Sequence, residues 1–165
     1  MLLANNNYVV NGRHDGRTAI TPVAIIDISK REQQKKSNKE LLEGVNPYRA
    51  LIDTGATSTM LSNKVISDLG LIPVGPAKFH GIHSVKIGVV YLFRVAFYGD
   101  VAGKDLLATR SIKTDKEVHK IYICPTDIEG GEIDEQPNFD VLLGMDVLRT
   151  GNLRIDKSGD FSFSF

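Results

Sequence analysis

The sequence predicts a mostly β protein that forms one domain over residues 1–165. Short segments rich in Val and Ile recur between turn residues, and no long helical periodicity is present. Strands and helices do not alternate as they do in parallel α/β sheets, and no internal repeat occurs. A chain of 165 residues suits one hydrophobic core better than two.

Composition argues against several classes of function. The 20 basic and 20 acidic residues cancel, so the net charge favours neither nucleic acid nor an anionic membrane as a partner. Cys124 is the one cysteine, and CxxC and HExxH motifs are absent, so no metal site is predicted. Residues 1–7 turn polar too early for a signal peptide, and no apolar run approaches the ~20 residues that span a bilayer. We therefore expect a cytoplasmic protein.

The first half of the chain predicts two strands and a helix. Residues 19–28 and 48–53 are rich in β-branched side chains and read as strands. The polar, basic run within residues 30–44 is interpreted as a solvated hairpin loop, with a basic patch for a partner as the alternative. Residues 62–69 predict a short helix that Ser62 caps.

The middle of the chain predicts a hairpin followed by an insertion. Residues 77–97 contain two β-rich arms around a small, polar tip at residues 81–84. Residues 99–138 form a long insertion. Within it, residues 117–124 alternate like a strand, and the acidic, glycine-bearing residues 126–138 predict a surface loop.

The end of the chain is more regular. Residues 139–143 predict a short buried strand, and residues 144–150 predict a helical turn or two. Residues 153–156 and 160–165 predict a hairpin around the turn at residues 157–159. The last arm alternates strictly, so its phenylalanines share one face that needs covering.

Two segments carry the chemistry. In residues 50–57 (ALIDTGAT) an apolar strand delivers Asp53, and Thr54 and Gly55 bend the chain directly after it. About ninety residues later, in residues 141–148 (VLLGMDVL), an apolar strand runs into Gly144, which opens a short helix.

These segments resemble the paired hallmarks of the retropepsins, the single-copy branch of the pepsin-like aspartic proteases. The hairpin within residues 79–97 looks like the flap of this family, and the order of the elements agrees over residues 49–165. The resemblance implies an all-β, closed acid-protease barrel with one or two short helices and a flap hairpin. It also implies activity as a homodimer, without a cofactor.

Hydrolysis by this family uses a water that attacks the peptide carbonyl while one carboxyl group takes a proton and another donates one. A second apolar-Asp-Thr/Ser-Gly motif is absent from the sequence. The resemblance therefore implies that the second Asp53 comes from another copy, which a twofold axis would place opposite the first.

The resemblance also implies roles for the residues around Asp53. Thr54 would hydrogen-bond across the twofold axis, and Gly55 would turn the backbone close to the substrate. Ala56 and Thr57 would lie along the cleft, although many retroviral members carry an acidic residue in place of Thr57.

Three residues of the flap tip, Gly81, Ile82 and His83, are expected to bind substrate. His83 and His80 could also be plain exposed loop residues. Gly144 would pack beneath the aspartate loop and support it.

The resemblance thus implies an aspartic endopeptidase that cuts extended peptides with apolar residues beside the scissile bond. The alternative is a catalytically inactive dimerisation or peptide-binding module, and a third possibility is a monomeric domain with an incidental Asp-Thr-Gly turn. Two further features stay open. Cys124 is either a redox-active thiol or a buried thiol of the core. Three phenylalanines of the last strand belong either to a dimer interface or to the subunit's own core: Phe161, Phe163 and Phe165.

Overall fold

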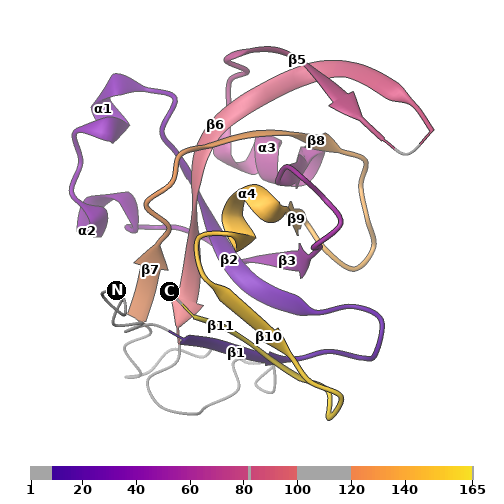
Figure 1. The fold of residues 1–165 in the computed structure, drawn as a ribbon. Helices are drawn as coiled ribbons and strands as arrows, with labels where there is room; N and C mark the ends of the chain where they lie inside the picture. Colours follow the sequence, from indigo (N-terminus) through magenta and orange to yellow (C-terminus); the bar gives the residue numbers. More distant parts are fainter. Residues whose placement is uncertain (1–8, 82, 100–119, 165) are drawn as a thin grey trace, which may run out of the picture.

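Six strands close into a barrel in the computed structural model, which describes residues 9–81, 83–99 and 120–164 (Figure 1). In spatial order around the ring, the strands are β2 (Ile20–Asp27), β3 (Tyr48–Ile52), β9 (Val141–Leu143), β4 (Met60–Ser62), β8 (Ile128–Ile133) and β6 (Val85–Gly99). Strand β6 then pairs again with β2, and this pairing closes the ring. The expectation of a mostly β, closed barrel is confirmed.

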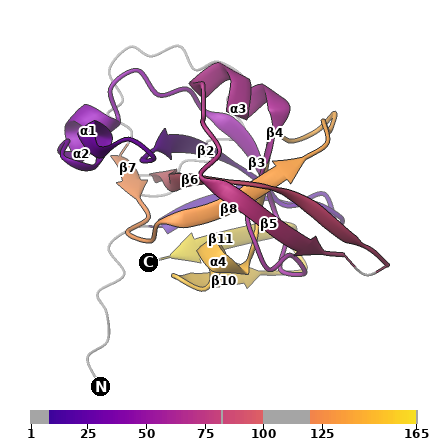
Figure 2. The ribbon, with the colours of Figure 1, turned by 90° about the horizontal axis from the view of Figure 1, so that it is seen from above.

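Strand β6 is long because it belongs to two structures. Its first part pairs with β5 (Gly75–His80) in a hairpin, and its second part pairs with β8, β2 and β7 (Lys120–Ile123). Figures 1 and 2 show the hairpin of β5 and β6 extending away from the barrel as a two-stranded arm. We call this arm, residues 75–88, the flap hairpin. The hairpin predicted within residues 77–97 is confirmed.

A second sheet lies against one end of the barrel. It consists of three antiparallel strands in the order β1 (Val9–Arg13), β11 (Asp160–Ser164) and β10 (Asn152–Ile155). The rings of Phe97 and Phe163, with centroids 5.3 Å apart, join this sheet to the barrel core. The predicted hairpin of β10 and β11 is confirmed, whereas β1 was not predicted.

The last strand packs within its own subunit. Phe161 and Phe163 are 3% and 1% exposed, and β11 is paired on both sides by β1 and β10. Phe165 lies outside the described residues. The described phenylalanines thus belong to the subunit's own core.

The polar stretch within residues 30–44 is not a plain loop, and this prediction was wrong. It contains α1 (Arg31–Gln34) and α2 (Asn38–Leu41). Ser37 and Glu40 form a reciprocal capping box at the start of α2, and this box satisfies backbone N–H groups that a helix end leaves open. The segment covers the outer face of β2, where Leu41 joins a second hydrophobic cluster with Ala24, Ile26, Ile28, Ala96 and Ile123.

The prediction of a surface loop over residues 126–138 was also wrong, because β8 lies in the barrel wall. Gly130 and Gly131, which look like turn glycines in the sequence, are buried in this strand. A Cβ added at Gly130 would meet the ring of Phe93 at 2.6 Å, and one added at Gly131 would meet the ring of Phe79 at 2.5 Å. The glycines are therefore required by the close approach of two aromatic rings.

The helix predicted at residues 62–69 is confirmed as α3 (Asn63–Leu69), which Ser62 caps and Gly70 ends in a left-handed conformation with φ 60°. The helical turn after Gly144 is confirmed as α4 (Met145–Leu148). The described residues thus hold four short helices, where one or two were expected. None of the helices in these parts of the chain is long and apolar enough to cross a membrane.

Candidate active site

Asp53 lies directly after the end of β3, where the pairing of β3 with β9 stops. Strand β3 pairs in parallel with β9, so that Ile52 is opposite Leu143. One residue further, the N–H of Asp53 donates to the carbonyl of Leu143 over 3.0 Å. The buried β3–β9 pair therefore fixes the backbone from which the Asp53 side chain emerges, and the residue itself is half-buried.

The turn after Asp53 is held by the carboxylate. The Gly55 N–H donates to Asp53 Oδ1 over 2.9 Å, and the Ala56 N–H donates to the Asp53 carbonyl over 3.2 Å. A Cβ at Gly55 would lie 3.2 Å from Asp53 Oδ1, which is a tight contact. Asp53 Oδ2 has no hydrogen-bond partner within the described ranges, so this oxygen is available for other groups.

Helix α4 holds this turn by hydrogen bonds. Its first N–H groups, of Met145 and Asp146, donate to the carbonyls of Ala56 and Thr57 over 2.8 and 3.1 Å. These are donors that a helix start leaves without intrahelical partners. Gly144 packs so closely on the loop that a Cβ there would lie 2.5 Å from the carbonyl carbon of Ser58. The structure thus places Gly144 directly against the aspartate loop, residues 53–59.

A hydrogen-bonded pair of Thr59 and the half-buried Asp146, which was not predicted from the sequence, completes this support. Thr59 is fully buried; its hydroxyl donates to Asp146 Oδ1 over 2.7 Å, and its N–H donates to Asp146 Oδ2 over 2.9 Å. The same hydroxyl accepts the N–H of Gly144 over 3.1 Å. The only local signal was an aspartate in the first turn of a helix, which gives no hint of a partner 87 residues away.

Two cavities flank the aspartate loop. One of about 350 Å³ is lined by His14, Gly16, Arg17, Thr18, Ala19, Ile52, Asp53, Thr54 and Ile155. The other, of about 440 Å³, is lined by Gly55, Ala56, Thr57, Ser58, Met60, Lys78, Phe79, His80, Ile133 and Leu142. The second cavity therefore lies between the aspartate loop and the flap hairpin.

The residues expected around Asp53 all line one or the other cavity: Thr54, Gly55, Ala56 and Thr57. The flap tip lies further out. Gly81 and His83 are exposed, and the Gly81 N–H donates to the Ser84 carbonyl over 2.8 Å in the turn. Ile82 lies outside the described residues. In place of the tip, the flap residues facing the second cavity are Lys78, Phe79 and His80.

Two other residues singled out in the sequence have ordinary surroundings. Cys124 is buried away from the site, and its Sγ lies 3.6 Å from Thr150 Oγ1, as expected for a packed thiol. His80 is exposed on β5, at the edge of the second cavity. No group of three side chains of the kinds that bind metals is found in the described parts of the chain.

Comparisons with known proteins agree with this fold. A family model described as aspartyl protease matches residues 41–147, more than half of the chain. The fold is similar to the crystal structure of a retropepsin-like aspartic protease from Rickettsia conorii. This structure has a TM-score of 0.51 and 13% sequence identity, and the match covers 95% of this chain and 92% of that one. The comparison with curated proteins gives no match.

The fold is therefore that of a retropepsin-like aspartic protease. The chain belongs to the aspartyl protease family.

Proposed function

We propose that this chain is an aspartic endopeptidase that acts as a homodimer and hydrolyses peptide bonds with a water held between two Asp53 carboxylates. One observation carries the proposal. Asp53 lines one of the two cavities that flank its turn. The Gly55 N–H donates to one of its carboxylate oxygens, and the other oxygen has no partner among the described residues. This is the position a general base needs, within reach of a bound water.

The subunit supplies half of the required pair. Within the described residues, Asp53 is the one carboxylate that lines either cavity. Two aspartates next to β9 are engaged elsewhere in the subunit. Asp140 Oδ2 accepts the Arg49 N–H, and the Asp146 carboxylate accepts the hydroxyl and the N–H of Thr59. A second copy, related by a twofold axis, is the source of the missing carboxylate.

Two carboxylates about 3 Å apart cannot both ionise, as is known for the aspartic-protease dyad itself, so they share one proton. The charged partner takes a proton from the water while the neutral partner gives one to the peptide carbonyl. We therefore expect the best activity on the acid side of neutrality. An activity that stayed flat far into the alkaline range would contradict a shared proton.

The cavity beneath the flap favours apolar residues beside the scissile bond. Its lining includes Met60, Phe79, Ile133 and Leu142, and burial of an apolar side chain there would stabilise the bound peptide by about 25 cal/mol per Å² removed from water. Within the described residues, β6 is the strand that joins the flap hairpin to the barrel, so the outer part of the arm can close over an extended peptide.

Cleavage of a peptide library by the wild type and by Asp53→Asn tests this function. Asparagine keeps an oxygen for the Gly55 N–H but cannot act as a base, so we expect cleavage to fall by about 10²–10⁴-fold or more while the melting temperature is unchanged. Equal cleavage by both proteins would place the chemistry elsewhere. Peptide binding without cleavage by the wild type would instead favour the inactive binding module.

A further inference from the structure

The two cavities beside Asp53 are lined by basic groups, although the whole chain carries no net charge. Apart from Asp53 itself, the ionisable residues that line them are His14, Arg17, Lys78 and His80. Residues 56–58 of the aspartate loop, which line the second cavity, are uncharged. The ionisable side chains that line these two cavities, other than Asp53, are therefore all basic, and positive charge attracts groups of opposite sign.

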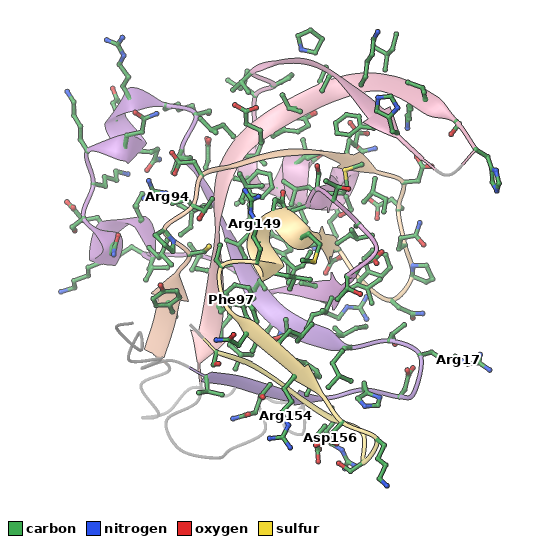
Figure 3. All side chains as sticks on the ribbon, in the orientation of Figure 1. Arg17, Arg94, Phe97, Arg149, Arg154 and Asp156 are labelled. Atoms are coloured by element: carbon green, nitrogen blue, oxygen red, sulfur yellow. The ribbon has the colours of Figure 1, made fainter. Side chains whose placement is uncertain are left out.

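Arg17 lines the cavity of about 350 Å³ beside Asp53, on the turn between β1 and β2. Its backbone is fixed, because Asp15 Oδ1 accepts the N–H groups of Arg17 and Thr18 over 2.8 and 2.6 Å. The side chain projects away from this turn and from the barrel (Figure 3). The Arg17 guanidinium forms no ion pair with any described residue, so its charge is available to another molecule.

Lys78 lines the other cavity, of about 440 Å³, and belongs to the flap hairpin. Strand β5 alternates, and Phe79 turns inward so that its ring packs beside Gly88 and Gly131. Lys78 and His80 are exposed on either side of it. Lys78 forms no ion pair within residues 9–81, 83–99 and 120–164.

We propose that the substrate is an acidic peptide in which the apolar residues at the scissile bond are flanked by Glu or Asp side chains that pair with Arg17 and Lys78. The inference rests on the proposed function for the position of the cleft. A twofold axis would repeat both cations on the other side of the scissile bond, so acidic residues would be selected on both sides.

The size of the effect follows from the exposure of these groups. An exposed ion pair changes the affinity for a peptide by about two- to fivefold. Arg17 and Lys78 contribute separately. Salt weakens such pairs, since the screening length falls from about 10 Å at 0.1 M to about 3 Å at 1 M ionic strength. The preference for acidic peptides should therefore shrink as salt is added, whereas the contribution of the apolar residues should not.

Three peptides with the same apolar centre and with Glu, Gln or Lys at the flanking positions test the inference. Their binding to Asp53→Asn is measured by fluorescence anisotropy at low and high salt, and their kcat/KM is measured with the wild type. We expect the order Glu, Gln, Lys in both measurements, with about two- to fivefold per charged contact. Arg17→Gln and Lys78→Gln should each reduce the preference.

Arg31→Gln and Lys39→Gln provide matched controls. They remove the same charges from α1 and α2, which lie on the opposite side of the barrel from Arg17 (Figures 1 and 3). Both should keep the full preference. Equal binding of the three peptides, or an undiminished preference in the Arg17→Gln/Lys78→Gln double variant, would overturn the inference.

The two readouts separate this inference from the proposed function. If the wild type cuts all three peptides equally, the protease function stands and the selection of acidic substrates fails. If Asp53→Asn prefers the Glu peptide but the wild type cuts none, the acidic preference stands as a binding property and the protease function fails.

Discussion

The aspartate loop and the flap hairpin face each other across one cavity, yet they are held in opposite ways. The loop, residues 53–59, is bonded to β9 through Asp53 and to α4 through Ala56, Thr57 and Thr59. The flap hairpin, residues 75–88, pairs chiefly with itself, and its arm ends in a turn closed by the Gly81–Ser84 hydrogen bond.

This difference suits the two tasks of the proposed peptide hydrolase. A catalytic carboxylate needs a fixed position, because small displacements of a catalytic group cost much of the rate. The roof must admit an extended chain and then close on it. In this fold the inward-facing ring of Phe79 is the point where the otherwise exposed arm touches the barrel, beside Gly131.

Glycine substitutions give the largest contrast between the two regions. In Gly144→Ala, the new Cβ would lie 2.5 Å from the Ser58 backbone, which cannot rotate away, so we expect a loss of about 3 kcal/mol in the free energy of unfolding. Nothing lies within 4 Å of the Cβ position at Gly75, at the base of the flap. Gly75→Ala should therefore stay within about 0.5 kcal/mol of the wild type by urea denaturation.

Removal of the half-buried Asp146 carboxylate, which accepts hydrogen bonds from the aspartate loop, should have the next largest effect. Asp146→Ala leaves the buried Thr59 hydroxyl and N–H without their acceptor, which should cost about 2 kcal/mol of unfolding free energy. The exposed Asp68, paired with Lys64 one helical turn away, provides the control, and Asp68→Ala should cost less than about 0.5 kcal/mol. Similar losses in both variants would mean that Thr59 and Asp146 do not anchor the loop.

A smaller effect on the free energy of unfolding is expected at high pH. It comes from Tyr48, at the start of β3, the strand that ends before Asp53. Burial, with help from the nearby Asp68 and Asp140 carboxylates, raises the pKa of Tyr48 from its ordinary value near 10 to about 12. The folded protein then holds this proton longer than the unfolded chain does, so stability is full below about pH 10 and falls between about pH 10 and 12.

Urea denaturation between pH 9 and 12 would measure this slope. In Tyr48→Phe the alkaline loss should be smaller than in the wild type, because the titrating hydroxyl is gone. An unchanged slope would assign the loss to other groups, such as Tyr98, whose pKa burial also raises.

Sequence patterns predicted the elements whose signals are local. Three such signals each span only a few residues: the Asp-Thr-Gly turn, the cap at Ser62 and the alternation in β11. The structure has a turn, a helix and a strand at these places. The capping box of Ser37 and Glu40 was also visible as a Ser-x-x-Glu spacing. It was overlooked because the surrounding charge suggested a solvated loop.

Features that depend on distant partners could not be predicted in this way. Gly130 and Gly131 look like turn residues until the rings of Phe79 and Phe93 are placed over them. The barrel position of β8 depends on β4 and β6, which are far away in the sequence. The bonds between Thr59 and Asp146 likewise join segments 87 residues apart.

A subunit-mixing experiment tests the central claim, that two copies share one reaction, most directly. A fixed amount of wild type is mixed with increasing Asp53→Asn, and cleavage is measured after the subunits have exchanged. If each site needs an Asp53 from both copies, activity per wild-type subunit should fall in proportion to the fraction of wild type in the mixture. If it stays constant at every ratio, one chain carries out the reaction alone and the two-copy account is contradicted.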